Sequence, residues 1–269
     1  MSNYLIIDLS YYNFYRFYAT KNWYSFAFRD EEYEPGYDWS ENIIFMEKFT
    51  KMFLENIKKY QKKFNIDTVY FAKDCKRKDI WRVSHYNGYK GTREETYTKK
   101  KFMGGKVFQK CYENIIPSML NDNVKEIKIN NLEADDIIYL LTNKILEKNN
   151  DVNIYIISSD HDLLQIIDGR DNIHLYTANL KCYNCKSKGS ADLDRFCKAM
   201  LGDPSDNIPK VFKRMGEKTA IKLYNNPNLL EKKFNDNPET KKQYDLNRLL
   251  IDFSYIPQQL IDDFNEKII

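Results

Sequence analysis

The sequence predicts an α/β fold in which a mainly parallel β-sheet carries helices on both faces. Four short apolar runs, rich in strand-forming residues, occupy residues 4–7, 66–72, 124–129 and 154–157. Apolar residues recur at helical spacing between them, over residues 43–64 and 134–145. Strands that alternate with helices form βαβ units, and these build parallel sheets covered on both sides.

The last third of the chain has a different pattern. Helical segments at residues 192–201, 217–225 and 239–253 are separated by glycine and proline. We therefore divide the chain into a domain at residues 1–190 and a helical module at residues 191–269. Within the first domain, residues 30–40 contain Pro35 and Gly36 and are predicted to form a surface loop.

Composition excludes several classes of protein. The 269 residues contain no apolar run long enough for a membrane span and no secretory signal pattern, and the five cysteines are scattered. We expect a soluble, cytoplasmic protein with free thiols and no membrane contact. Three distant histidines argue against an imidazole-rich metal centre, and the nine glycines form neither standard nucleotide-binding loop.

Positive charge is concentrated in one segment, although the net charge is only +3. Residues 73–106 contain eleven basic residues against four acidic ones. Aromatic residues are interleaved with them, a combination that suits a phosphate backbone with stacked bases. A solvated, lysine-rich loop explains the same charge run equally well.

Acidic residues follow all four predicted strands. In a parallel sheet the carboxyl ends of the strands meet at one crevice, so these acids should lie together. Hard divalent cations, Mg²⁺ or Mn²⁺, would offset their repulsion. Taken singly, Glu133, Asp135 and Asp136 are better explained as charges in the first turn of a helix, and Asp160 and Asp162 could equally be turn and N-cap residues. The metal interpretation gains because four separate strand ends carry acids together. The acids are Asp8, Asp74, Glu133, Asp135, Asp136, Asp160 and Asp162.

Two ions bound by carboxylates are the usual apparatus for phosphodiester hydrolysis, because one activates the attacking water and both stabilise the transition state. Together with the basic segment, the acids indicate a nuclease. The scarcity of histidine is consistent with this interpretation, since metal ions would take over the acid–base work.

Six motifs stand out between Asp8 and about Lys222. They are Asp8, Phe71-x-x-Asp74, Tyr89-Lys90-Gly91-x-Arg93, Glu133-Ala134-Asp135-Asp136, Ser159-Asp160-His161-Asp162 and Gly202-Asp203-Pro204-Ser205-Asp206-Asn207. In this order they resemble the flap endonuclease (5′ nuclease) family, within the PIN-like nuclease fold. Residues 250–257 further resemble the phage-encoded ribonuclease H branch, which removes RNA primers.

The resemblance implies two metal sites and an arch. The first ion would be held by Asp8, Asp74, Glu133 and Asp135, with Asp136 close by. The second would be held, directly or through water, by Asp160, Asp162, Asp203 and Asp206. A basic arch at about residues 75–110 would admit a 5′ strand, with Tyr89 stacking on a base and Lys90 and Arg93 contacting the scissile phosphate. Nucleic-acid contacts are also expected from Arg82 and Arg16.

The resemblance also implies a helix-three-turn-helix at about residues 191–224 that grips duplex backbone, often with K⁺. In this chain the hairpin retains one glycine, Gly216, so capture of phosphate by backbone amides and a K⁺ site are both left open. Charge could hold phosphate instead, through Lys210, Lys213, Arg214 and Lys218, and a plain basic turn is the alternative.

The implied function is that of a metal-dependent 5′ to 3′ exonuclease and flap endonuclease. Its substrates would be RNA–DNA hybrids, duplex DNA and branched 5′ flaps, as in RNA primer removal during replication. We expect a monomer, in the host cytoplasm if phage-encoded, that meets replication proteins such as a single-strand-binding protein or a sliding clamp. The alternatives are a nucleic-acid-binding module on a nuclease scaffold and a PIN-type single-strand ribonuclease.

Overall fold

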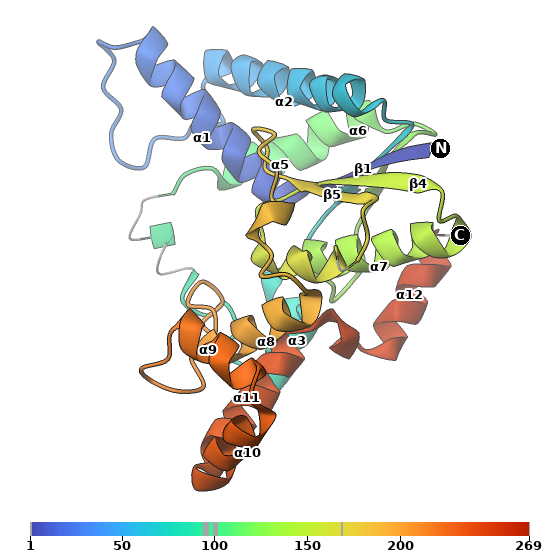
Figure 1. Ribbon diagram of the computed structural model, residues 1–269. Helices are drawn as coiled ribbons and strands as arrows, with labels where there is room; N and C mark the ends of the chain where they lie inside the picture. Colours follow the sequence, from blue (N-terminus) through green and yellow to red (C-terminus); the bar gives the residue numbers. More distant parts are fainter. Residues whose placement is uncertain (1, 94–96, 99–101, 168, 269) are drawn as a thin grey trace.

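The structure, a computed structural model, describes residues 2–93, 97–98, 102–167 and 169–268 (Figure 1). Its described part contains a five-stranded sheet in the order β3-β2-β1-β4-β5, with every neighbouring pair parallel. The strands are β1 (Ser2–Asp8), β2 (Thr68–Ala72), β3 (Val124–Ile127), β4 (Val152–Ile157) and β5 (Ile173–Tyr176).

Side chains of the central strand β1 alternate between two buried cores. Ile6 packs into one core, whereas Leu5 and Ile7 pack into the other. Successive residues of a strand point to opposite faces, so the sheet separates the two cores. Both cores are completed by helices, which confirms the predicted α/β fold with a parallel sheet covered on both faces.

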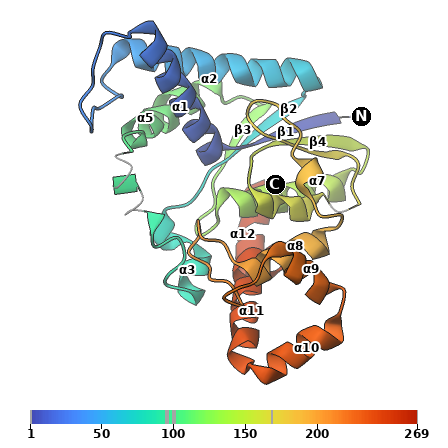
Figure 2. The same cartoon turned by 60° about the vertical axis from the view of Figure 1, so that its left-hand side comes forward.

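One face of the sheet is covered by the helices that follow β1 and β2 (Figures 1 and 2). The long helix α2 is capped by Asn42, whose side chain accepts a hydrogen bond from the Phe45 amide at 2.8 Å, and it buries apolar residues along one face. The elements of this layer are α1 (Leu9–Ala27), α2 (Ile43–Phe64), α5 (Gly105–Lys110), the π-helical turn η2 (Cys111–Ile115) and α6 (Ile116–Met119).

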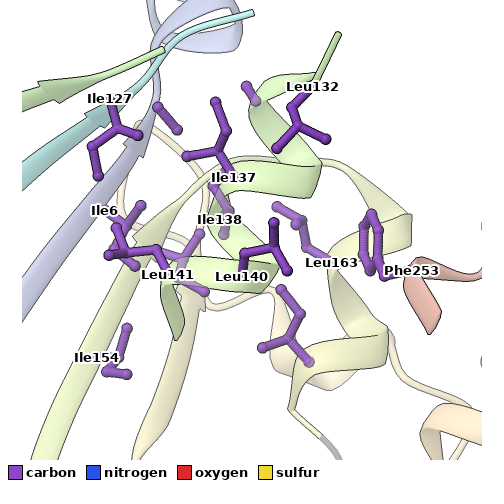
Figure 3. Packing of buried hydrophobic residues seen from close by; sticks show 14 of the residues in the cluster. Ile6, Ile127, Leu132, Ile137, Ile138, Leu140, Leu141, Ile154, Leu163 and Phe253 are labelled. Carbon is purple, nitrogen blue, oxygen red and sulfur yellow. The ribbon is translucent and has the colours of Figure 1, made fainter. Parts of the chain in front are cut away.

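The other face is covered by α7 (Ala134–Lys148), with α12 (Gln258–Ile268) packed beyond it. Figure 3 shows side chains of α7, among them Ile137 and Leu141, facing Ile6 and Ile127 of the sheet. Since α7 begins just beyond β3, its first turn lies at the carboxyl edge of the sheet. The packing of this helix therefore fixes the acids at its N-terminus.

The C-terminal helices form a smaller core of their own around Phe196, Met200 and Leu223. The chain then returns, because Phe253, Ile256 and Phe264 belong to the core on the α7 face of the sheet. A division of the chain at residue 190 stays a prediction. The elements are α8 (Ala191–Leu201), α9 (Glu217–Tyr224), α10 (Pro227–Asp236), α11 (Pro238–Ile251) and η5 (Phe253–Tyr255).

The sequence patterns left several elements unpredicted, among them β5, α1, α5, α6 and α10. Residues 28–42, between α1 and α2, contain no helix or strand, in line with the loop expected at residues 30–40. Within the described residues, no helix combines the length and apolarity that crossing a bilayer requires. The remaining short elements are η1 (Arg77–Asp79), α3 (Trp81–His85), η3 (His161–Ile166) and η4 (Asn184–Lys186).

Candidate functional site

Acidic residues gather at the carboxyl edge of the sheet. β1 ends at Asp8, which is in register with Ala72 of β2, and the preceding Ile7 is in register with Ile157 of β4. Asp74 and Asp160 follow β2 and β4 within three residues. Glu133 is the N-cap residue of α7, which follows β3. Parallel pairing therefore brings four chain segments to one edge.

Hydrogen bonds fix the first of these acids in place. Asp8 accepts from the Tyr11 amide at 3.0 Å, which caps α1, and from Ser158 Oγ at 2.9 Å. Asp74 accepts from the Ala134 amide at 2.8 Å and from the Ser10 hydroxyl. The two carboxylates are thus tied to three chain segments, which orients both of them before any ligand binds.

Burial and then mutual repulsion raise the proton affinity of two acids in this cluster. Burial, together with the charge of Asp74, raises the pKa of Asp8 to about 7. Burial and the charges of Asp160 and Asp8 raise the pKa of Asp135 well above its usual range. Negative charge therefore outweighs positive charge around these two carboxyl groups. A divalent cation would reverse that balance.

A second acidic group surrounds Lys198 of α8. The ammonium Nζ lies 2.5 Å from Asp162 Oδ1, 2.9 Å from Asp203 Oδ2 and 3.9 Å from Asp160 Oδ1. Burial, only partly offset by Lys198, raises the pKa of Asp162 to about 7. Burial also acts on Asp203, but Lys198 and Ser205 outweigh it and lower its pKa to about 2.

Glu133 lies in a third group, where cations surround it. It accepts hydrogen bonds from Lys90 Nζ, from Arg82 at 2.9 Å and from the Tyr89 hydroxyl at 2.9 Å. Burial favours the neutral form of Glu133, yet Lys90 and Arg82 outweigh it and lower its pKa to about 2. Glu133 is therefore a carboxylate at neutral pH and is held against the segment that carries Tyr89 and Lys90.

Asp206 joins the same network from the loop after α8. The Lys90 amide donates to the Asp206 carbonyl at 2.9 Å, and Lys90 Nζ lies 3.8 Å from the Asp206 carboxylate. Arg93 donates to that carboxylate at 2.6 Å while 37% of its side chain stays exposed. Of Lys90 and Arg93, the two predicted phosphate contacts, Arg93 is therefore the more open to a ligand.

Arg82 lies where an internal ion pair, rather than a nucleic-acid contact, is formed. It is 3% exposed and donates to Asp136 at 2.7 and 2.8 Å as well as to the Leu250 carbonyl at 2.6 Å. Asp136 also accepts from the Trp81 indole at 3.1 Å and from the Glu133 amide at 3.1 Å. Both Arg82 and Asp136 are thus engaged in holding α3 and α11 against α7.

Two further predicted contacts are buried. Arg16 is 4% exposed, and its guanidinium lies 4.3 Å from the centre of the Tyr15 ring. Tyr89 is 5% exposed, and its hydroxyl points to Glu133. In this conformation neither side chain presents the surface that its expected role requires, since phosphate contact needs an open guanidinium and base stacking an open ring face.

The basic residues predicted to bind duplex are exposed. Three lie in the loop between α8 and α9, and Lys218 lies on α9. Lys210, Lys213, Arg214 and Lys218 all lie on the surface, and Lys210 Nζ donates to the Met215 carbonyl at 3.1 Å. The arch is described only in part: its residues 94–96 and 99–101, which include the basic run at 99–101, lie outside the described residues. The part of the prediction that rests on them stays untested.

The donor set fits a hard divalent ion. All the acids at this edge offer oxygen, which selects Mg²⁺ or Mn²⁺ over softer metals. In the described part of the chain no three His, Cys, Asp or Glu side chains already stand at ligating positions. Instead Lys90 and Lys198 place ammonium groups among the acids, so ion binding would require these side chains to give way.

Three contributors to the site were not found in the sequence. Ser10 and Ser158 orient Asp74 and Asp8, and Lys198 neutralises the second acidic group. Ser10 follows Asp8 by two residues and Ser158 directly follows β4, so their positions beside the acids offered a signal. Lys198 offered none, because its role depends on how α8 packs against η3.

Comparisons with known proteins identify the family of this chain. A family model described as the 5′-3′ exonuclease, N-terminal resolvase-like domain matches residues 3–193. The 5′-3′ exonuclease of Mycoplasmopsis pulmonis is 31% identical over 190 residues, which cover 68% of this chain and 59% of that protein. DNA polymerase I of Lactococcus lactis is 26% identical over 204 residues, which cover 68% of this chain and 21% of the polymerase.

Solved structures show the same fold. The 5′-exonuclease of bacteriophage T5 with zinc bound has a TM-score of 0.70 at 17% identity, over 99% of this chain and 98% of that one. A complex of the T5 flap endonuclease with DNA and metal ions has a TM-score of 0.68 at 17% identity, over 99% and 97%. The match at residues 3–193 spans most of the chain, which therefore belongs to the 5′-3′ exonuclease family.

Proposed function

We propose that this chain is a metal-dependent nuclease that hydrolyses phosphodiester bonds from or near a 5′ end. The observation that carries the proposal is the buried acidic cluster at the carboxyl edge of the sheet, where burial and then neighbouring carboxylates raise the pKa of Asp8 to about 7 and also raise that of Asp135. A structural cluster of this kind costs stability unless a cation binds to it. Family membership supports the same conclusion.

Two ions, Mg²⁺ or Mn²⁺, would be divided between two sets of residues. Asp8, Asp74, Glu133 and Asp135 would hold the first, and Asp160, Asp162, Asp203 and Asp206 the second. When bound, such ions activate water and stabilise the charge that develops on the phosphate. Arg93, partly exposed beside Asp206, would contact the phosphate and orient it, with Lys90 behind it.

RNA–DNA hybrids, duplex DNA and branched 5′ flaps are the proposed substrates, and primer removal in replication is the proposed setting. DNA polymerase I and a 5′-3′ exonuclease are among the relatives, and a T5 relative was solved with DNA. Exposed Lys210, Lys213 and Arg214 would hold duplex phosphates by charge. We further propose a monomer that works beside replication proteins, a single-strand-binding protein or a sliding clamp among them.

The test is cleavage of a 5′-labelled flap substrate with and without Mg²⁺. We expect metal-dependent release of short products by the unaltered chain and a loss of at least about a thousandfold in Asp8→Asn and Asp135→Asn. Both variants should keep their affinity for the substrate, measured by fluorescence anisotropy in Ca²⁺. Asp122→Asn, at an exposed position far from the edge, is the matched control and should cleave normally.

Three outcomes would contradict the proposal. Cleavage that persists in EDTA would show that hydrolysis does not require metal ions. Cleavage of free single-stranded RNA alone, with branched and duplex substrates untouched, would favour the single-strand ribonuclease. Tight binding without turnover under any divalent ion would favour a binding module.

A further inference from the structure

Three hollows follow one another along the outer face of α1 and lead away from the acidic site. The first, of about 370 Å³, is lined by Phe14, Arg93 and Tyr97 together with Pro204 and Ser205. The second, of about 360 Å³, lies between Tyr11, Phe14, Tyr15 and Tyr18. The third is a cavity of about 460 Å³ that begins at Tyr18 and Lys21.

Shared lining residues show that neighbouring hollows adjoin one another. Phe14 lines both the first and the second, and Tyr18 lines both the second and the third. The first also contains Arg93, which donates to Asp206 of the acidic site. The path from Phe14 to Ser25, which lines the third cavity, covers eleven helical steps, or about 16 Å at ~1.5 Å per residue. We call this face, from Tyr11 to Ser25, the α1 aromatic track.

Tyr11, Phe14 and Tyr15 pack against the core, but part of each side chain remains accessible. Tyr18 is 47% exposed, and Phe14 and Tyr15 are half-buried. Phe102, which belongs to the arch segment, places its ring 4.9 Å from that of Phe14 and 6.3 Å from that of Tyr18, between centroids. Accessible aromatic rings that lie next to one another on a protein surface commonly mark a binding site.

The third cavity adds charge and enclosure. Lys21 and Arg29 line it together with Tyr24, Tyr33 and Trp39, and Lys21 Nζ lies 5.7 Å from the centre of the Trp39 ring. Its volume falls in the range of small-ligand sites. Aromatic rings that accept the flat face of a base, with cations that accept phosphate, are the usual features of a single-strand binding groove.

We propose that the α1 aromatic track binds the single-stranded 5′ segment of a branched substrate, with bases stacked on Tyr18 and received in the cavity beside Lys21. The inference rests on the proposed function, since that function supplies the strand beside Arg93. The ligand chemistry is a base joined to a phosphodiester, which single-stranded DNA and RNA share. The consequence is that affinity depends on the length of the flap.

The experiment measures binding in Ca²⁺ to a series of substrates whose 5′ flaps grow from none to about ten nucleotides, a span typical of single-strand sites. We expect the affinity of the unaltered chain to rise with flap length over about the first four nucleotides and then to level off. Tyr18→Ala and Lys21→Ala should each remove about tenfold of that rise, as the loss of one stacked base or one phosphate contact would. Neither variant should change the affinity for the substrate without a flap.

Phe26→Ala is the matched control, because Phe26 is an aromatic residue of the same helix, 72% exposed, that does not line the cavities. It should bind every flap as the unaltered chain does. A flap made of abasic nucleotides separates stacking from charge. Its binding free energy should lack the contribution of Tyr18 and keep that of Lys21. DNA and RNA flaps of equal length show which strand the track prefers.

The outcomes separate this inference from the proposed function. If the protein cleaves branched substrate but its affinity does not depend on flap length, the proposed role of the α1 aromatic track is wrong. The proposed nuclease function is then unaffected. Equal losses for Tyr18→Ala on substrates with and without flaps would also contradict the role of the track, since they would indicate a general structural defect. Length-dependent binding that Tyr18→Ala abolishes would support the track even if no metal ion gave cleavage.

Discussion

Lys198 of α8 lies 2.5 Å from Asp162 of η3, measured from Nζ to Oδ1, and so joins the C-terminal helices to the edge of the sheet. The same ammonium contacts Asp203 at 2.9 Å. A single cation thus compensates acids that are proposed to hold a metal ion. The helical module and the acidic edge are consequently coupled by charge as well as by packing.

Replacing Lys198 should show how far its charge stabilises the buried acids around it. Lys198→Met leaves Asp162 and Asp203 buried without their cation, and we expect a loss of about 3 kcal/mol in the unfolding free energy of the metal-free protein. Mg²⁺ should restore more stability to this variant than to the unaltered chain, in thermal melts across a range of ion concentrations. Lys242→Met, at an exposed surface pair with Glu239, is the control. Equal Mg²⁺ shifts in all three proteins would contradict the coupling.

The metal-free protein should lose stability as the pH rises from about 4 to about 7. Folding raises the pKa of Asp8 and of Asp162 from the ordinary 3.8 to about 7, so the folded state binds the extra protons. This stabilisation is complete below pH 4 and is lost as the pH rises through the pKa of the folded state. For each group the unfolding free energy falls by at most about 1.4 kcal/mol per pH unit. Urea titrations across this range measure it.

Two comparisons sharpen the pH test. Asp8→Asn should flatten the slope, because its side chain no longer titrates, and saturating Mg²⁺ should do the same by favouring the ionised form. Glu133 and Asp203, whose pKa values are lowered to about 2, act in the opposite direction below about pH 4.5. Burial lowers the pKa of His161 and of His174 from 6.5, so both oppose the slope at pH values up to about 6.5, and Asp8→Asn isolates the contribution of Asp8 from theirs. A metal-free stability that rises between pH 5 and 7 would contradict the raised pKa values.

Arg82 should behave as a structural residue. Arg82→Ala leaves Asp136 and Glu133 buried with one cation fewer, and we expect a loss of about 3–5 kcal/mol in urea unfolding. The double variant Arg82→Met with Asp136→Asn should recover part of that loss, whereas Lys78→Ala, on the exposed surface nearby, should lose little. A variant that is fully stable but binds nucleic acid weakly would show that Arg82 contacts substrate after all.

Gly202 should tolerate no side chain. Its φ of +67° is strained for other residues, and an added Cβ would lie 2.4 Å from the Ile208 carbonyl oxygen. Gly202→Ala is therefore expected to cost about 1–3 kcal/mol or more and to displace the loop that carries Asp203 and Asp206. Gly216→Ala, where a Cβ meets open space, is the control in thermal melts. Equal melting temperatures for both variants would contradict the close approach.

The salt dependence of duplex affinity should show whether Lys210, Lys213 and Arg214, which lie between α8 and α9, contact phosphate. If Lys210, Lys213 and Arg214 each hold a phosphate, neutralising one of them lowers the slope of log affinity against log salt concentration by about 0.9. Duplex affinity measured by anisotropy across a salt series gives that slope. An unchanged slope in Lys213→Ala and Arg214→Ala would indicate a plain basic turn, the alternative that the sequence left open.

The parts of the fold with a strong local signal were predictable. The acids after β1, β2, β3 and β4 follow apolar runs, and the periodicity of α2 and α7 was clear enough to imply a parallel sheet. Helix α1 was missed because aromatic residues occupy nearly every one of its faces, so that Tyr12 is buried while Tyr18 is exposed and no single apolar stripe stands out. The edge strand β5 has four residues and too little pattern.

The site was less predictable, because its charges are paired across long distances in the chain. Arg82 and Lys90 lie in the segment with the highest positive charge, and nothing in their spacing shows that they pair with Glu133, more than forty residues away. Burial of Tyr89 likewise depends on the loop that carries Asp206. The sequence indicated which residue types meet but not which of them neutralise one another.

Anomalous scattering from crystals grown with Mn²⁺ tests the central claim most directly. The account predicts two manganese peaks at the carboxyl edge of the sheet, one among Asp8, Asp74 and Asp135 and one among Asp160, Asp162 and Asp203, with Lys198 moved away from its present contacts. Absence of both peaks at saturating Mn²⁺, with Lys198 still bound to Asp162 and Asp203, would contradict it.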